Sequence, residues 1–222
     1  MKDYGTFDIL GPIMIGPSSS HTAGAARLAK ISKNIAGDGF NEVEFILHGS
    51  FAKTYKGHGT DKALIAGILD MEPSDENIRD SFNIAKSKNL NIIFTEEDLG
   101  YEHPNTVKIL FKYPNKDDFY VTGSSIGGGN IIITDIDGNK VEFTGDKPTI
   151  LLKYKDRKGV ISEVSSIAVN NDLNIATMKV TREKDIATMV CELDSEITKS
   201  TIDQINNLKD ISYIKFINPI ER

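Results

Sequence analysis

A short stretch near the N-terminus carries more hydroxyl groups than a helix end needs. Residues 16–27 read GPSSSHTAGAAR, in which Ser18, Ser19, Ser20 and Thr22 surround His21. A single side-chain oxygen is enough to cap a helix N-terminus. Because the first turn of a helix favours anions, the extra hydroxyls and the imidazole predict a site for a carboxylate or a similar group. The alternative is that the stretch is only a helix cap, with more hydroxyl groups than capping requires.

A second histidine lies between two glycines, in residues 56–61, which read KGHGTD. Glycines have no β-carbon that would shield His58, and Thr60 or Asp61 can cap a helix predicted to begin at Lys62. An imidazole titrates near neutral pH and can both take up and return a proton. His58 is therefore the predicted general base, and the alternative is a buried structural histidine.

Two further segments are candidates for the same site. His103 and Asn105 stand in the sequence EHPN at residues 102–105. Residues 123–130 read GSSIGGGN, and a glycine run of this kind can cradle a phosphate, including that of pyridoxal phosphate. A bare glycine-rich turn is also typical of a bulge or bend between strands.

The elements that position these residues follow from hydrophobic periodicity. It predicts a mixture of helices and strands in the first part of the chain, followed by a series of short strands. Residues 50–61 are predicted to form a loop between a strand and the N-terminus of a helix. Asp-Gly at 137–138 predicts a hairpin turn. The predicted helices span 22–36, 62–69 and 75–88, and the predicted strands span 42–48, 91–95, 107–113, 119–122, 131–135 and 140–143.

A different order of predicted helices and strands follows the predicted linker GDKP at residues 145–148. It is βαββαβ, the split βαβ pattern, which places both helices on one face of a sheet. Cys191 alternates with Met189 and Leu193 on the apolar side of its strand, which predicts a buried core thiol. The elements span 149–154, 160–170, 175–182, 186–193, 199–208 and 212–217.

Composition excludes several classes of protein. The 222 residues are 39% hydrophobic and 26% charged, with a net charge of −6 and no basic stripe, which argues against nucleic-acid binding. No apolar run approaches the roughly 18–20 residues of a membrane helix. The N-terminal residues MKDYGTFDIL do not read as a signal peptide, so we expect no membrane association and a cytoplasmic location. One cysteine excludes an internal disulfide and an iron–sulfur cluster ligated by this chain alone.

Several long motifs resemble the β subunits of bacterial iron–sulfur-dependent L-serine dehydratases. They read, in chain order, GPIMIGPSSSHTAGAAR, ILHGSFAKTYKGHGTDKALIAG, EHPNT and GSSIGGGNI. Residues 149–222 resemble the ACT family of regulatory domains, and residues 1–146 are similar to the allosteric substrate-binding domain of some phosphoglycerate dehydrogenases. The resemblances imply an α+β fold, with an α+β domain at 1–146 and a ferredoxin-like βαββαβ ACT domain at 149–222.

The resemblance also implies a function. L-Serine would be converted to pyruvate and ammonia at a [4Fe–4S] cluster held by a separate α subunit, with no metal ligand from this chain and with His58 as the base. An amino-acid effector would approach the backbone at Gly159, and the ACT domain would self-associate; the alternatives are that Gly159 only satisfies a turn and that the domain only dimerises. Further residues would border the substrate or shape its loop: Ser18, Ser19, Ser20, His21, Thr22, Thr60, Asp61, His103 and Asn105.

Two other interpretations remain open from the sequence. The chain could be a non-catalytic, amino-acid-sensing regulatory subunit whose partner performs all the chemistry. A weaker interpretation, based on the glycine run at 127–129, is a pyridoxal-phosphate lyase.

Overall fold

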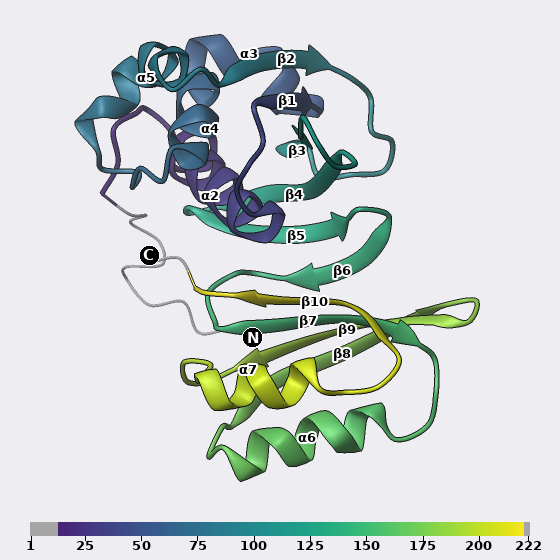
Figure 1. The fold of residues 1–222 in the computed structure, drawn as a ribbon. Coiled ribbons are helices and arrows are strands. Elements are labelled where there is room, and N and C mark those ends of the chain that lie inside the picture. The colour runs from purple at the N-terminus through teal and green to yellow at the C-terminus, as the bar shows by residue number, and fades with distance from the viewer. Residues whose placement is uncertain (1–12, 220–222) are drawn as a thin grey trace. The chain divides into compact units, whose positions relative to one another are not determined.

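A computed structural model describes residues 13–219, which form two compact units (Figure 1). One unit ends at Gly138 and the other begins at Asn139. The predicted domain boundary between residues 146 and 149 lies a short way further along the chain. The predicted outer limits, at residues 1 and 222, lie outside the described residues.

A mixed sheet and a set of helices make up the first part of the chain. The strand order is β2-β1-β3-β4-β5-β6, with β1 and β2 parallel and the pairs β1–β3, β3–β4 and β4–β5 antiparallel. The strands are β1 (Glu42–Leu47), β2 (Asn91–Glu96), β3 (Thr106–Lys112), β4 (Phe119–Gly127), β5 (Asn130–Ile136) and β6 (Asn139–Phe143). The helices are the π-helix η1 (Ser19–Gly24), α2 (Ala25–Ala36), α3 (Gly49–His58), α4 (Thr60–Ile68), the 3₁₀ helix η2 (Glu76–Asp80) and α5 (Ser81–Ser87).

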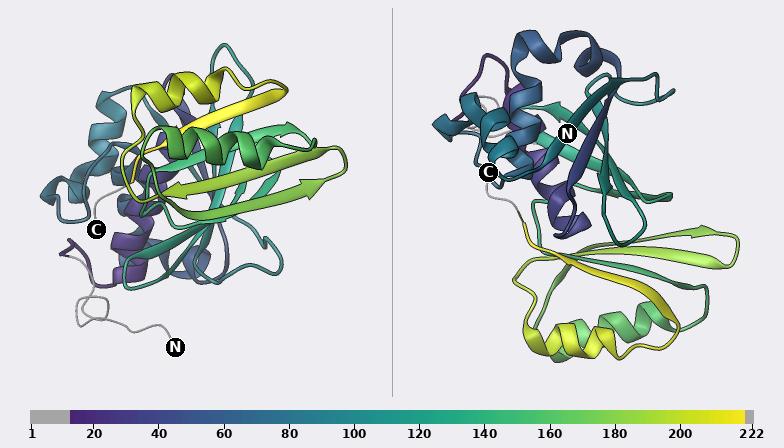
Figure 2. Two further views of the ribbon diagram at one scale, coloured as in Figure 1. Left: turned by 90° about the horizontal axis from the view of Figure 1, so that it is seen from below. Right: turned by 45° about the horizontal axis from the view of Figure 1, so that its top comes forward.

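The helices gather on one face of this sheet (Figures 1 and 2). Along β1, Val43, Phe45 and Leu47 are fully buried, while the residues between them are only partly buried. This alternation is what a strand with one covered face requires. Helix α2 packs against both α4 and β4, so the hydrophobic core holds the end of η1 in place.

The prediction of a loop at residues 50–61 is wrong, because helix α3 occupies most of them. The backbone N–H groups of Ser50 and Phe51 both donate to the carbonyl of Pro104, at 2.6 and 3.3 Å. A distant loop thereby satisfies donors in the first turn that have no partner within the helix. The Phe51 side chain is fully buried and ties α3 to the core.

The end of α3 also differs from the prediction. Gly59 adopts the left-handed conformation (φ 69°, ψ 22°) as the C-cap of α3 and is at the same time the N-cap of α4. The prediction that Thr60 or Asp61 caps the following helix is therefore wrong. Asp61 Oδ1 accepts instead from the N–H of Lys62, at 2.8 Å. His58 is the last residue of a helix and not part of a loop.

The remaining predicted elements are present with changed limits. The helix predicted over 75–88 is divided into η2 and α5, and the strand predicted over 119–122 continues to Gly127. The glycine run is the turn between β4 and β5, where all three glycines have positive φ. Asp137 and Gly138 also have positive φ (49° and 81°), as a type I′ turn requires, so the predicted hairpin is confirmed.

After β6, which belongs to the six-stranded sheet, the second unit has the predicted βαββαβ order. Its sheet order is β10-β7-β9-β8, and both helices lie on one face (Figure 1). The elements are β7 (Thr149–Lys155), α6 (Val160–Asn170), β8 (Ile175–Glu183), β9 (Ile186–Leu193), α7 (Lys199–Asn206) and β10 (Ile211–Ile217). The α+β fold class is confirmed, and the helix 160–170 and the strand 186–193 have the predicted bounds.

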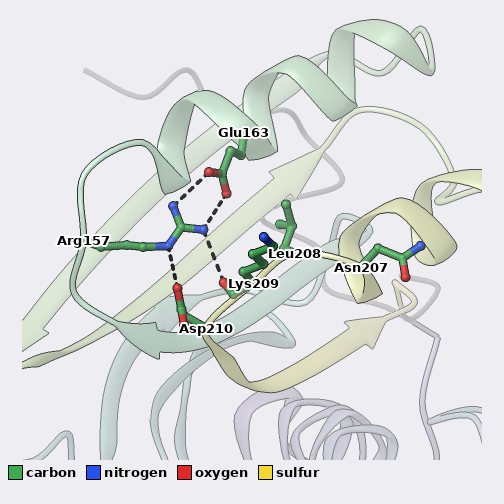
Figure 3. Close-up of a pocket in the computed structure, with 6 residues that line it drawn as sticks. All are labelled: Arg157, Glu163, Asn207, Leu208, Lys209 and Asp210. Carbon is green, nitrogen blue, oxygen red and sulfur yellow. Dashed lines mark hydrogen bonds and ion pairs between the residues drawn. The ribbon is translucent and has the colours of Figure 1, made fainter.

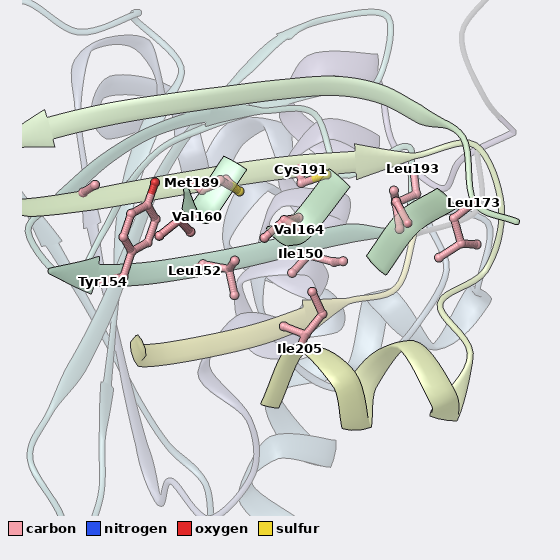
Figure 4. Packing of buried hydrophobic residues seen from close by; sticks show 12 residues of the cluster. Ile150, Leu152, Tyr154, Val160, Val164, Leu173, Met189, Cys191, Leu193 and Ile205 are labelled. Atoms are coloured by element: carbon pink, nitrogen blue, oxygen red, sulfur yellow. The ribbon is translucent and has the colours of Figure 1, made fainter. Parts of the chain in front are cut away.

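Cys191 lies in the core of this second unit, among residues of β7, β9, α6 and α7 (Figure 4). Its side chain is fully buried, which confirms the predicted core thiol. Burial raises the pKa of the thiol to about 11. The thiolate, which is the form that binds metals, is therefore strongly disfavoured at this position.

None of the helices within residues 13–219 combines the length and the apolar character needed to cross a membrane. The cytoplasmic location stays a prediction.

Candidate functional site

Ser18 caps the first helical turn and also holds His21. Its backbone is extended (φ −142°, ψ 124°), and its Oγ accepts from the backbone N–H of His21 at 3.4 Å. The same oxygen lies 3.3 Å from His21 Nδ1. One serine thus does the capping, while Ser19 and Ser20 lie half-buried in the first turn of η1.

The other nitrogen of the His21 ring faces two hydroxyls of α3. Nε2 lies 3.1 Å from Thr54 Oγ1 and 3.4 Å from Ser50 Oγ. Since the Thr54 hydroxyl donates its proton to the Ser50 carbonyl at 2.8 Å, its oxygen is left to accept from Nε2–H. His21 is then the Nε2–H tautomer, and its Nδ1 accepts from Ser18.

His58 lies one turn beyond Thr54, with its ring centroid 4.7 Å from that of His21 and a tilt of 36° between the ring planes. Its Nδ1 is 3.3 Å from the carbonyl oxygen of Thr54. A carbonyl only accepts, so Nδ1 carries the proton and Nε2 carries the lone pair. Within residues 13–219 no hydrogen-bond partner of this Nε2 is found. His58 thus has a free basic nitrogen, whereas both nitrogens of His21 are occupied.

The environment of His21 opposes a positive charge. Burial lowers the pKa of His21 below its usual value of 6.5, and the neighbouring His58 lowers it further. Two imidazoles this close do not both take up a proton readily, because the second charge is repelled by the first. A positive charge on His58 therefore disfavours a second positive charge on His21.

We expect the His21 ring to titrate below pH 6.5, as measured by NMR, and we expect His58→Gln to raise that midpoint only part of the way back. The reason is that burial, the larger cause, remains after the substitution. Because the folded state holds this proton less tightly than the unfolded state, His21 contributes to a loss of stability as pH falls below 6.5. A midpoint that returns fully to 6.5 in His58→Gln would contradict the dominance of burial.

His58 lines a cavity of about 360 Å³, and His21 is not among the lining residues. The walls come from the turn before η1, the end of α3, the start of α4 and η2. The lining residues are Ile15, Gly16, Pro17, Lys56, Gly57, His58, Gly59, Lys62, Ile78 and Arg79.

The loop at residues 102–105 positions α3 rather than the imidazoles. Gly49 allows the Pro104 carbonyl to reach the start of the helix, since a β-carbon at Gly49 would lie 2.6 Å from that oxygen. The side chain of Asn105 donates to the Ser125 carbonyl at 3.4 Å. His103 is exposed, and its Nδ1 accepts from the N–H of Asn105 at 3.1 Å. Substrate roles for His103 and Asn105 stay predictions.

The glycine run packs against η1 and α2. The buried guanidinium of Arg27 donates to the carbonyl of Gly129 at 2.7 Å. Gly24 lies against Ser125, where an added β-carbon would be 2.8 Å from the Ser125 β-carbon. These close approaches explain why the residues after the hydroxyl stretch are small.

Three buried hydroxyls around the site have no hydrogen-bond partner among the described residues: Thr22, Thr60 and Ser125. Asp61 is half-buried, and burial raises the pKa of its carboxyl, although the N–H of Lys62 and the charges of Lys62 and Lys56 act in the opposite direction. The structure thus places Thr60 and Asp61 next to the cavity wall without assigning them a ligand.

Sequence reasoning missed Ser50 and Thr54. Both are on α3 at positions i and i+4, and His58 follows at i+8, so the three share one face of the helix. This spacing is visible in the sequence, but it is informative only once the segment is treated as helical.

In the second unit, Gly159 has φ 96° at the N-cap of α6. A cavity of about 450 Å³ is lined by Arg157 and Glu163, which lie on either side of Gly159 in the chain, but not by Gly159 itself (Figure 3). Arg157 lines it and donates to both carboxylate oxygens of Glu163, at 2.8 and 2.7 Å, and to the Lys209 carbonyl at 3.2 Å. Asp210 lies 3.4 Å from its Nε. The arginine is thus matched by two carboxylates of the same unit, and effector binding at Gly159 stays a prediction.

Comparison with known proteins finds one matching family model and several chains of similar sequence. Residues 5–90 match the family model of the serine dehydratase beta chain. The chain is 48% identical over 220 residues to the "L-serine dehydratase, beta chain" of Peptoniphilus asaccharolyticus, which covers 98% of this chain and 99% of that one. It is 42% identical over 214 residues to the "Probable L-serine dehydratase, beta chain" of Bacillus subtilis, covering 95% and 96%. It is also 28% identical over 200 residues to a D-3-phosphoglycerate dehydrogenase of Methanocaldococcus jannaschii, covering 87% of this chain and 37% of that enzyme.

Proposed function

The chain belongs to the family of L-serine dehydratase β chains, and on that basis we propose that it supplies the proton-transfer groups of an L-serine ammonia-lyase. The reaction converts L-serine to pyruvate and ammonia. The observation that carries the proposal is the pairing of His58, whose Nε2 is free, with a His21 that is held in place by hydroxyls and whose pKa is lowered by burial and by His58.

His58 is the base in this proposal. Its Nδ1–H is held by the Thr54 carbonyl, which leaves Nε2 to take the proton from the α-carbon of serine. The β-hydroxyl leaves as water with the proton that His58 has taken up, and the product is an enamine. The enamine gains a proton at its terminal carbon and loses one from its nitrogen to become an imine, and one water hydrolyses the imine to pyruvate and ammonia. The water that was lost is thus regained, and the reaction balances without an oxidant.

His21 is a positioning residue in the same proposal. It contacts Ser18, Ser50 and Thr54 through its ring nitrogens, and its ring lies against those of Phe51 and His58. A neutral ring held in this way limits the movement of the His58 ring. It also avoids placing a fixed positive charge next to the base.

The described residues, 13–219, do not provide a set of ligands for an iron–sulfur cluster. Within residues 13–219 no three His, Cys, Asp or Glu residues are grouped so that they could hold a metal ion. The single thiol, Cys191, is buried in the second unit and has a pKa of about 11. We therefore propose that a separate α subunit holds a [4Fe–4S] cluster, which would supply Lewis-acid assistance to the departure of the hydroxyl. We also propose that the second unit mediates self-association.

The test is reconstitution with the α subunit under anaerobic conditions. We expect the isolated chain to retain no iron and to form no pyruvate from L-serine, and we expect the complex to retain iron and to form pyruvate. Iron and sulfide retained by the isolated, folded chain would contradict the assignment of the cluster to the α subunit. An aldimine absorbance in the active complex would favour pyridoxal phosphate instead.

The α subunit alone is the control that distinguishes a catalytic role of this chain from a purely regulatory one. The similarity to a phosphoglycerate dehydrogenase, an enzyme named for a different reaction, covers 87% of this chain. Similarity over this region is therefore not by itself a sign of dehydration chemistry. If the α subunit alone formed pyruvate as fast as the complex, the chain would be a regulatory subunit.

A further inference from the structure

The cavity beside His58 is lined by three cationic side chains from three different elements. Lys56 comes from α3, Lys62 from α4 and Arg79 from η2. None of the residues that line the cavity within the described part of the chain is an aspartate or a glutamate. The remaining wall is apolar or glycine, apart from His58 itself.

The three cations differ from other basic residues of the same unit. Lys30 pairs with Glu72, and Lys33 pairs with Asp70. No ion pair of Lys56, Lys62 or Arg79 is found among residues 13–219. The ammonium of Lys56 lies 5.5 Å from the centre of the Tyr55 ring.

Two carboxylates are close to these cations in the chain, because Asp61 precedes Lys62 and Asp80 follows Arg79. The Asp61 carboxylate interacts with the charges of both lysines and accepts from the Lys62 backbone N–H. Neither carboxylate lines the cavity, so the lining itself carries three positive charges and no negative charge. A concave site lined by charges of one sign attracts small ions of the opposite sign. A cavity of about 360 Å³ is also within the range of small-molecule sites.

We propose that Lys62 and Arg79 bind the carboxylate of the amino-acid substrate in this cavity, an inference that rests on the proposed function. Lys62 is half-buried, and a short connection at Gly59 separates it from the base. Arg79 offers the planar fork of donors that matches a carboxylate. Lys56, in the last turn of α3, adds positive charge without a direct contact to the substrate.

This placement has a chemical consequence. Removal of the α-proton leaves negative charge on a carbon that is next to the carboxylate, and two cations on the carboxylate reduce the repulsion between these charges. With the carboxylate bound by Lys62 and Arg79, Ser18 positions His21 instead of bordering the substrate as predicted, because its hydroxyl is already bound to His21.

The test uses Lys62→Gln and Arg79→Gln in the complex with the α subunit, with Lys62→Arg as the variant that keeps the charge. For each glutamine variant we expect KM for L-serine to rise about 10- to 100-fold, the effect of losing a charge-assisted hydrogen bond, with a smaller change in kcat. Lys62→Arg should stay within about threefold of the wild type. Lys88→Gln removes an exposed lysine that does not line the cavity and should leave KM unchanged.

The affinity between the two subunits is measured on the same variants. An unchanged KM in both glutamine variants would overturn the inference. A weaker αβ complex with an unchanged KM at saturating α subunit would overturn it too, because the cations would then face carboxylates of the partner. If the wild-type complex formed no pyruvate from L-serine, the proposed function would fail, and this inference with it.

Discussion

We expect His58→Gln to lower the kcat of the reconstituted complex for L-serine by about 100-fold or more, the usual effect of losing a general base. Glutamine cannot accept the α-proton, although it keeps a side-chain amide that can donate to the Thr54 carbonyl, as Nδ1–H does now. The loss should therefore appear in kcat and kcat/KM together and not in KM alone. The measurement is pyruvate formation at saturating and limiting L-serine.

The matched control is His48→Asn. His48 is also half-buried and accepts the N–H of Leu99 through Nδ1, at 3.1 Å, and an asparagine side chain can keep this hydrogen bond. His48 does not line the cavity beside His58, so kcat should stay near that of the wild type. Each variant complex must retain its iron and its subunit composition. If the His58→Gln complex retains both and still turns over L-serine at a near wild-type kcat, His58 is not the base.

The second large effect concerns stability. We expect Gly67→Ala to destabilise the chain by about 3 kcal/mol, the upper end of the usual range for overpacking. A β-carbon at Gly67 would lie 2.8 Å from the Ala29 β-carbon and 2.9 Å from the Lys30 nitrogen, and closer still to the Ala26 carbonyl oxygen. Because two of these three atoms belong to the backbone of α2, the helices α2 and α4 must move apart. Urea unfolding followed by circular dichroism measures the change.

Gly57→Ala is the matched control for this prediction. Gly57 is also a helical glycine, but nothing lies within 4 Å of a β-carbon added there. Alanine should therefore stabilise α3 by roughly 0.5–1 kcal/mol through its higher helix propensity. Equal effects of the two substitutions would show that α2 and α4 are not packed as closely at Gly67 as the structure indicates.

The elements of the second unit could be predicted from the sequence alone. Each of its helices and strands shows the periodicity of its own type, and Cys191 alternates with Met189 and Leu193 on the buried side. Periodicity is a property of consecutive residues, so it is readable without knowledge of the fold. The glycines beside His58 and the hydroxyls around His21 likewise marked two residues that the structure brings together.

Helix α3 and the geometry of the site were decided only by the tertiary structure. Residues 49–59 contain three glycines, which locally favour a loop over a helix. The helix forms because the Pro104 carbonyl accepts from its first turn and because Phe51 is buried, and both contacts involve residues distant in the chain. Only this helix places Thr54 between His21 and His58. Tertiary contacts of this kind overcome local propensity, and they leave no periodic signal in the segment that they stabilise.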